Sequence, residues 1–502
     1  MQGSPRNCRK VRRAARRCQR AAQAGGAGGG GGQGSRAPAR AIYANFARLR
    51  LPAGVPDAAT DDANEDLIAM MHLNLFIFGC GHHRAAWRHP DSAAERLGDI
   101  AYYESLARTA ERGKLDAIFF ADGQSMDNIG DGPRWYLEPL TTMAAIARAT
   151  THIGLISTVS STFFTPFHAA RMVASLDHIS GGRMGWNVVT SMFDAEARNH
   201  GYEAMPGHDW RYARAEEFVD VALRLFDSWD DDALAIDRNG YFGVPDRLHK
   251  IDHHGEHFLV DGPLTVPRPP QGHPVLFQAG ASDQGRDLAA RRAEAIYAVA
   301  YDLPAAQSYY RDIKQRVRAA GRDAFVPIMP GLVTYVGATE AEARAKQREL
   351  DELLPADASL RQLGMFVQKD CSGWELDAPV PPLPPLSEFT GPKGRYATIL
   401  RIIETEQPTV RQLLGRLAAG GGHCTMVGTP EQIADRMEHW FRNEGADGFN
   451  LMPPSLPGGI DDFVEQVVPV LQKRGLFRKD YEHATLRGHL GLERPGRRMA
   501  GN

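Results

Sequence analysis

Residues 152–190 read HIGLISTVSSTFFTPFHAARMVASLDHISGGRMGWNVVT, and this stretch decides the fold. Its first eight residues form an apolar run that predicts a buried strand, and its last eight predict another. The segment from Pro166 has the apolar spacing of an amphipathic helix, which Gly181-Gly182 ends. A strand, a helix and a second strand predict a parallel pair, because parallel strands need a long crossover connection.

The same alternation continues through most of the chain. Further strands are predicted over 72–78, 115–121, 274–279, 294–300, 326–336 and 445–452, and further helices over 93–112, 137–149, 209–228, 304–320 and 461–474. The strands are apolar along their whole length, as parallel strands buried on both faces are. Eight such strands predict an α/β fold, a (β/α)8 TIM barrel with insertions, at residues 71–485.

Two stretches interrupt this pattern. Residues 229–273 are polar and contain many Gly, Pro and His residues, so we expect an insertion. Residues 354–428 fit no strand–helix unit, and the proline-rich part within them is expected to be a loop. A new helix is then predicted at Thr429, because Thr as N-cap, Pro430 at the first helical position and Gln432 form a capping box.

The two ends of the chain differ from this patterned region. Residues 1–70 contain an arginine run and a nearly pure glycine tract, with no acidic residue before Asp57. Such a composition buries too little apolar surface to offset the entropy of ordering, so we expect a disordered tail. A start at Met70 or Met71 is one alternative, and a nucleic-acid arm or a targeting peptide is another. Residues 486–502 are expected to form a C-terminal tail.

The bulk properties indicate a soluble enzyme. The chain has 502 residues, 43% of them hydrophobic, and a formal net charge of −3, which gives the whole molecule no affinity for nucleic acid or membrane surfaces. The five cysteines are odd in number and form no CxxC pair, as expected in the reducing cytoplasm. No apolar run approaches the roughly 18 residues of a membrane span.

Polar residues follow the predicted strands, where a parallel barrel holds its ligand. After five strands stand Cys80, His82 and His83, then Asp122, then Thr158, then Asn187 and Ser191, and then Ser282. Any single one can be a helix cap, but their recurrence at five strand ends predicts a ligand site.

The segment 280–286, GASDQGR, follows a strand and opens a helix, so its backbone N–H groups and Ser282 predict a phosphate site. An ordinary strand-to-helix turn is the alternative. The histidines show no zinc-like spacing, so we expect no metal. Cys80 has no clear base partner, which favours a buried small residue over a nucleophile.

Six blocks carry a family resemblance. They are GHHRAAWR (81–88), LDHISGGRMGWNVVTS (176–191), ARNHG (197–201), HDWRY (208–212), QAGAS (278–282) and DGFNL (447–451). They resemble the nitrilotriacetate monooxygenase-like branch of the bacterial luciferase superfamily, which includes dibenzothiophene sulfone and dimethyl sulfide monooxygenases. The resemblance extends from about residue 71 to about residue 481.

The resemblance implies a two-component, FMN-dependent monooxygenase. A separate NAD(P)H-dependent flavin reductase would supply FMNH2, and O2 would react with it to a flavin hydroperoxide that oxidises a small organic substrate. The FMN contacts implied are Asp122, Thr158, Asn187, Ser191, His208, Tyr212 and Ser282, with His208, Tyr212 and Ser282 at the phosphate. Cys80, His82, His83 and Trp87 would line the space over the flavin. A homo-oligomer, such as a dimer, is also expected.

Three alternatives stay open at this point. The chain could use a deazaflavin hydride carrier, as a sister branch of the superfamily does. It could bind nucleic acid through its basic N-terminal tail, or bind a flavin without catalysis. The substrate cannot be identified from the residues.

Overall fold

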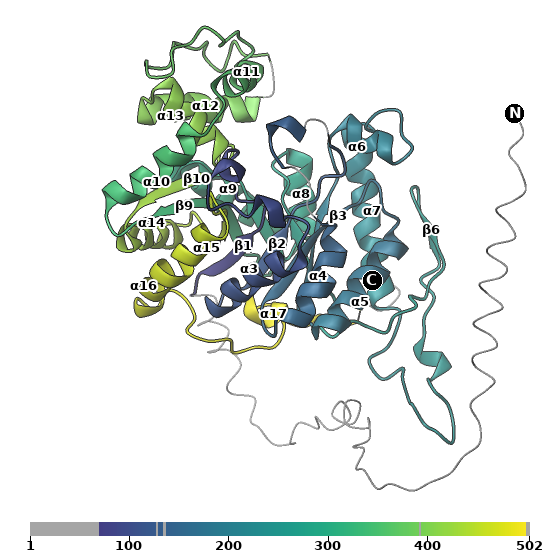
Figure 1. The fold of residues 1–502 in the computed structure, drawn as a ribbon. Helices are drawn as coiled ribbons and strands as arrows, with labels where there is room; N and C mark the ends of the chain where they lie inside the picture. Colours follow the sequence, from purple (N-terminus) through teal and green to yellow (C-terminus); the bar gives the residue numbers. More distant parts are fainter. Residues whose placement is uncertain (1–69, 127–128, 134–136, 391–392, 498–502) are drawn as a thin grey trace, which may run out of the picture. The chain divides into compact units, whose positions relative to one another are not determined.

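The computed structural model describes residues 70–126, 129–133, 137–390 and 393–497. The expected disordered tail lies outside the described residues, apart from Met70. Within the described part, strands and helices alternate from His72 onward (Figure 1).

Eight parallel strands close into a barrel, which confirms the predicted fold. They are β1 (His72–Phe76), β2 (Ala117–Phe120), β3 (Gly154–Ser160), β4 (Met184–Val189), β7 (Val275–Gln278), β8 (Ala295–Ala298), β9 (Ile328–Val336) and β11 (Gly448–Leu451). They pair in the order β11-β1-β2-β3-β4-β7-β8, and β9 pairs with both β8 and β11, which closes the ring. Nearly every strand residue is buried, as a sheet covered on both faces requires.

Helices cover the outside of the barrel (Figure 1). They include α3 (Ile100–Arg112), α4 (Pro139–Ala149), α5 (Pro166–Ser180), α7 (His208–Phe226), α8 (Asp283–Arg292), α9 (Leu303–Ala319), α10 (Glu340–Glu352), α14 (Pro430–Arg442), α15 (Gly458–Asp462) and α16 (Val468–Lys473). The capping box predicted at Thr429 is confirmed: its side chain accepts from the backbone N–H of Gln432. The helix predicted from residue 93 begins only at Ile100, because Asp99 is its N-cap and accepts from Ala101 N.

The sequence analysis missed a ninth parallel strand, β10 (Cys424–Gly428). It pairs with the second half of β9, from Leu332 to Val336, beyond the part of β9 that belongs to the closed barrel. Three further helices precede it in the stretch that fitted no unit: α11 (Ala356–Val367), α12 (Lys393–Glu406) and α13 (Val410–Ala418). They share a small apolar core of their own around Tyr396 and Leu413.

The expected insertion at residues 229–273 contains little regular structure. A two-residue antiparallel pair joins β5 (His253–His254) to β6 (Leu259–Val260). The rest follows the surface as turns, as expected of a segment rich in Gly, Pro and His.

The N-terminal end of the barrel is closed by residues near the C-terminus. Leu486 begins a short helix, α17 (Leu486–His489), and packs with Leu490 against inward-facing strand residues such as Ile156. The guanidinium of the buried Arg487 donates to the carboxylate of Glu294 at 2.7 Å. This end is therefore filled by side chains, and the open end is the one at which the strands finish.

Candidate active site

The polar residues predicted at the strand ends meet at the open end of the barrel. Thr158 on β3 and Asn187 on β4 are paired in register and buried. The Asn187 amide donates to the Thr158 hydroxyl at 3.1 Å, and that hydroxyl donates to the Phe120 carbonyl at 2.9 Å. The Asn187 side-chain oxygen is buried without a hydrogen-bond partner among the described residues. A buried acceptor left unpaired has a desolvation cost, so it points to a donor from a ligand.

Asp122 and Ser191 flank this pair at neighbouring strand ends. Burial raises the pKa of the Asp122 carboxyl, although Gln124 donates to it at 2.7 Å. Ser191 has a positive φ of 51° just after β4, and its hydroxyl lies 2.8 Å from that of Ser160. The left-handed backbone at Ser191 turns the chain away from the barrel mouth towards α6 (Asp194–Asn199).

A second group of predicted residues forms a recess at the N-termini of α7 and α8. The hydroxyl of Ser282 lies 3.3 Å from that of Tyr212 and accepts from the backbone N–H of Gly285 at 3.2 Å. The rings of His208 and Tyr212 are 4.7 Å apart. Both helices point their free N–H ends at this recess, which favours a negative charge there. The structure thus brings together the three residues that the resemblance assigns to a phosphate.

Two glycines keep the recess open. A Cβ on Gly280 would lie 2.7 Å from the Cα of Gly285, and one on Gly285 would lie 3.0 Å from the Tyr212 hydroxyl. Both positions therefore require glycine, because real Cβ atoms do not come so close to backbone.

A cavity of about 410 Å³ opens beside β1 and β2. Its lining includes Cys80, His82, His83, Trp87 and Asp122, together with Phe193, Glu196 and Gln362. Four of these were predicted to line the space over a flavin, and Asp122 joins this cavity to the polar strand ends. The cavity has the size of an ordinary small-molecule site.

His82 is neutral in this cavity. Burial lowers its pKa to about 4, opposed by the hydrogen bond in which Nε2–H donates to the Phe76 carbonyl at 3.0 Å. Because Nε2 carries the proton, Nδ1 is left as an acceptor. The His82 ring also packs edge-on against the Phe76 ring, 4.5 Å away.

His83 and Cys80 are less suited to proton or electron-pair transfer. Nδ1 of His83 accepts from Ala85 N at 3.2 Å, and Nε2–H donates to Asp351 Oδ1 at 3.2 Å, so both ring nitrogens are used. Burial, and secondarily the charge of Glu95, raises the pKa of the Cys80 thiol to about 11. The thiol therefore stays protonated near neutral pH.

His423, which the sequence analysis did not single out, lies close to this site. It stands just before β10, and its Nε2 is 3.0 Å from the Tyr297 hydroxyl on β8. Burial, the neighbouring His82 and Arg395 lower its pKa to about 3, and its Nδ1 is buried without a partner in the described part of the chain. The only signal in the sequence was its position before an unrecognised strand.

Aromatic rings connect the two histidines. The ring centroids of Phe76 and Tyr297 are 5.8 Å apart, and those of Phe119 and Tyr297 are 6.0 Å apart. These rings fill the top layer of the barrel interior between His82 and His423. The arrangement offers two neutral imidazoles at the edge of an apolar floor.

Within the described ranges, no group of three or more His, Cys, Asp or Glu side chains is placed to hold a metal ion. Nor does any described helix combine the length and apolar character needed to cross a bilayer.

Known proteins share this architecture. The family model for luciferase-like monooxygenases matches residues 75–448. The chain belongs to the luciferase-like monooxygenase family. It is accordingly an oxidoreductase, and its fold and its strand-end site are those of this family.

Individual relatives narrow the branch. N-acetyl-S-(2-succino)cysteine monooxygenase of Bacillus subtilis (strain 168) is 44% identical over 432 residues, covering 85% of this chain and 98% of its own length. Nitrilotriacetate monooxygenase component A of Aminobacter aminovorans is 44% identical over 446 residues, covering 86% and 98%. A solved riboflavin lyase with modified FMN and riboflavin is 31% identical, with a TM-score of 0.72, covering 84% of this chain and 96% of its own. The family resemblance inferred from the sequence blocks is thereby confirmed.

Proposed function

We propose that this monooxygenase uses FMNH2, supplied by a separate NAD(P)H-dependent flavin reductase, and O2 to oxidise a small organic substrate. The observation that carries the proposal is the recess of Gly280, Ser282 and Gly285 facing Tyr212 at two helix N-termini. It has the donors and the space for a phosphate, and it lies at the same barrel mouth as the unpaired Asn187 oxygen.

The residues present fit FMN. Ser282, Tyr212 and His208 would hold its phosphate through hydroxyl and imidazole donors and the N–H groups at the start of α8. Thr158, Asn187, Ser191 and Asp122 would lie along the ribityl chain and the ring. The unpaired Asn187 oxygen supplies an acceptor for a hydroxyl or ring N–H of the cofactor.

Reduced FMN, when bound, supplies the electrons that activate O2 and deliver one oxygen atom to the substrate. The chain's own residues bind, orient and exclude water. The apolar floor formed by the Phe76, Phe119 and Tyr297 rings keeps water from the site. Neutral His82 and His423 can each accept a hydrogen bond or take a proton at an uncommitted ring nitrogen.

A reductase partner follows from the absence of a second nucleotide site in the sequence. The matches to G-x-G-x-x-G in the N-terminal glycine tract follow no predicted strand. The relative from Aminobacter aminovorans is named component A, in keeping with a divided system. We also propose a homo-oligomer, and a cytoplasmic location in keeping with the free thiols of Cys80, Cys371 and Cys424.

For the substrate, the two relatives at 44% identity act on molecules that carry several carboxylates, as their names state. The mouth cavity of this chain contains Arg84, His82 and Gln362, which can bind carboxylates through charge and hydrogen bonds. We therefore propose aminopolycarboxylates and carboxylated thioethers as the first substrates to screen, with sulfones and uncharged thioethers as the comparison.

Anaerobic titration tests the cofactor assignment. We expect the protein to bind FMNH2 more tightly than oxidised FMN, and to bind it in preference to a reduced deazaflavin of the same concentration. Preferential binding of the deazaflavin would instead favour the sister branch that transfers hydride.

A further inference from the structure

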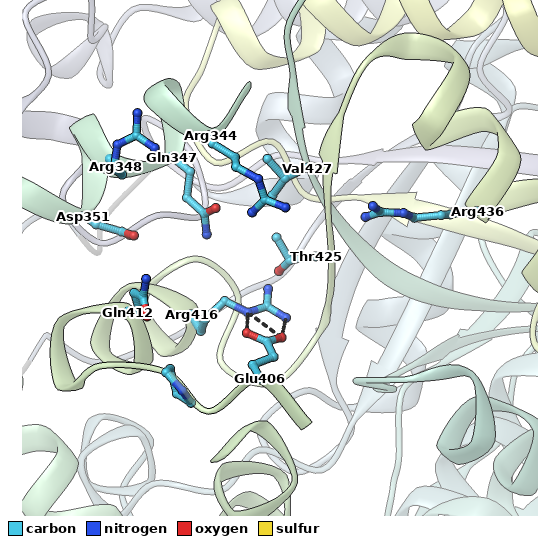
Figure 2. A pocket seen from close by; sticks show the side chains of 11 residues that line it. Arg344, Gln347, Arg348, Asp351, Glu406, Gln412, Arg416, Thr425, Val427 and Arg436 are labelled. Carbon is cyan, nitrogen blue, oxygen red and sulfur yellow. Dashed lines mark hydrogen bonds and ion pairs between the residues drawn. The ribbon is translucent and has the colours of Figure 1, made fainter. Parts of the chain in front are cut away.

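A second cavity, separate from the barrel mouth, lies between α10, α13, β10 and α14. Its volume is about 500 Å³, and we call it the arginine pocket. Its lining consists of Arg344, Gln347, Arg348, Asp351, Glu406, Pro408, Gln412, Arg416, Thr425, Val427 and Arg436. Figure 2 shows the guanidinium groups of Arg344 and Arg416 on opposite sides of Thr425, with Arg436 reaching in from α14.

The four arginines differ in how they are compensated. Arg344 pairs with Glu340 on its own helix at 2.6 Å, and Arg416 pairs with Glu406 at 2.7 Å. Arg348 and Arg436 make no ion pair with any described residue. Four arginines face two acidic side chains, Asp351 and Glu406, in the lining itself, an excess of two positive charges.

Neutral donors complete the pocket. The side chains of Gln347 and Thr425 form no hydrogen bond within the described part of the chain, so both are available to a ligand. Only Val427 and Pro408 contribute apolar side chains. A ligand that fits this lining is strongly polar and negatively charged, and two uncompensated guanidinium groups match two negative charges.

The arginine pocket adjoins the active-site cavity without being part of it. Asp351 lines the pocket, and it accepts from Nε2–H of His83, which lines the cavity at the barrel mouth. Asp351 is buried against Gly415, where a Cβ would come within 2.5 Å of both carboxylate oxygens. The His83–Asp351 pair is thus the wall between the two spaces.

We propose that the arginine pocket binds a small polyanion with at least two phosphate or carboxylate groups, at a site distinct from the flavin and substrate sites. The inference does not depend on the proposed flavin chemistry, because every residue that carries it lies outside the barrel mouth. Phosphate and carboxylate share the bidentate geometry that a guanidinium recognises.

Isothermal titration of the full-length protein with pyrophosphate and with citrate tests this proposal, with NaCl of equal ionic strength as the blank. We expect saturable binding of at least one probe. The tighter probe identifies the source chemistry: pyrophosphate indicates a phosphate ligand and citrate a carboxylate ligand.

The variant Arg348→Ala/Arg436→Ala is expected to weaken this binding at least tenfold, since it removes two charged donors. Both side chains are exposed and unpaired, so the fold is expected to be unaffected. Arg171→Ala/Arg318→Ala is the matched control, because these two arginines are also exposed and unpaired but lie on α5 and α9.

Two results would overturn the proposal. One is the absence of saturable binding by both probes. The other is binding that survives in Arg348→Ala/Arg436→Ala but is lost in Ser282→Ala, which would place the anion in the recess at α8 instead.

Discussion

A Cβ on Gly331 would lie 2.4 Å from Nδ1 of His423. Gly331 belongs to β9, a strand of the barrel wall, whereas His423 enters from the segment before β10. The barrel therefore lacks a side chain at the one place where the imidazole of His423 rests. This close approach fixes the ring beside Tyr297 and relates the 354–428 region to the catalytic end of the barrel.

Gly331→Ala is accordingly expected to push His423 out of place. We predict a fall in kcat of at least tenfold under supplied FMNH2, with an unchanged far-UV circular dichroism spectrum. Gly373→Ala is the control, because a Cβ there meets nothing within 4 Å. Equal turnover in the two variants would mean that the position of His423 is unimportant to the reaction.

The binding recess predicts a second effect. Ser282→Ala and His208→Ala each remove a donor to a charged phosphate, worth roughly 1.5–3 kcal/mol, so FMNH2 affinity should fall by about one to two orders of magnitude. Anaerobic titration measures this, and Ser308→Ala, on the exposed side of α9, is the control. Wild-type affinity in both variants would refute the phosphate assignment.

Cys80 is expected to be a packing residue. With a pKa of about 11, its thiolate fraction at pH 8 is on the order of 10⁻³. We predict that Cys80→Ala retains turnover within about twofold, and that iodoacetamide labels Cys80 at least a hundredfold more slowly than N-acetylcysteine, measured by peptide mass spectrometry. Rapid labelling at pH 8, or an inactive Cys80→Ala, would restore the nucleophile hypothesis.

The lowered histidine pKa values predict how stability depends on pH. His82 and His423 titrate near 4 and 3 in the folded protein but near 6.5 when unfolded. The unfolded state thus binds more protons between these values, so the free energy of unfolding should fall as the pH falls from about 6.5 towards 4. In His423→Gln this fall should be smaller, as urea unfolding can measure. His168→Gln, at an exposed position, is the control, and an identical slope in the two variants would contradict the burial of His423.

The sequence predicted the elements whose signals are local. The apolar strands and the Thr429 cap were recognisable because each depends on neighbouring residues alone. β10 was missed because it is short, follows a glycine run and pairs with a part of β9 that a standard barrel strand does not have. The importance of His423 could not be predicted for the same reason, since its partners Tyr297 and Gly331 are distant along the chain.

The residues of the site show the same division. The grouping of His208, Tyr212 and Ser282 was expected only through the family resemblance, because α7 and α8 are separated by the whole 229–273 insertion. That both nitrogens of His83 are used could not be foreseen, as Asp351 reaches it from a helix far along the chain.

The central claim is that this enzyme depends on reduced flavin made by another protein. Oxygen uptake and product formation, measured with NADH, FMN and a carboxylated thioether or aminopolycarboxylate, test it most directly. We predict no turnover by the purified protein alone, and turnover as soon as an unrelated flavin reductase is added. Turnover without the reductase, or a tightly held oxidised flavin that NADH reduces directly, would contradict the account.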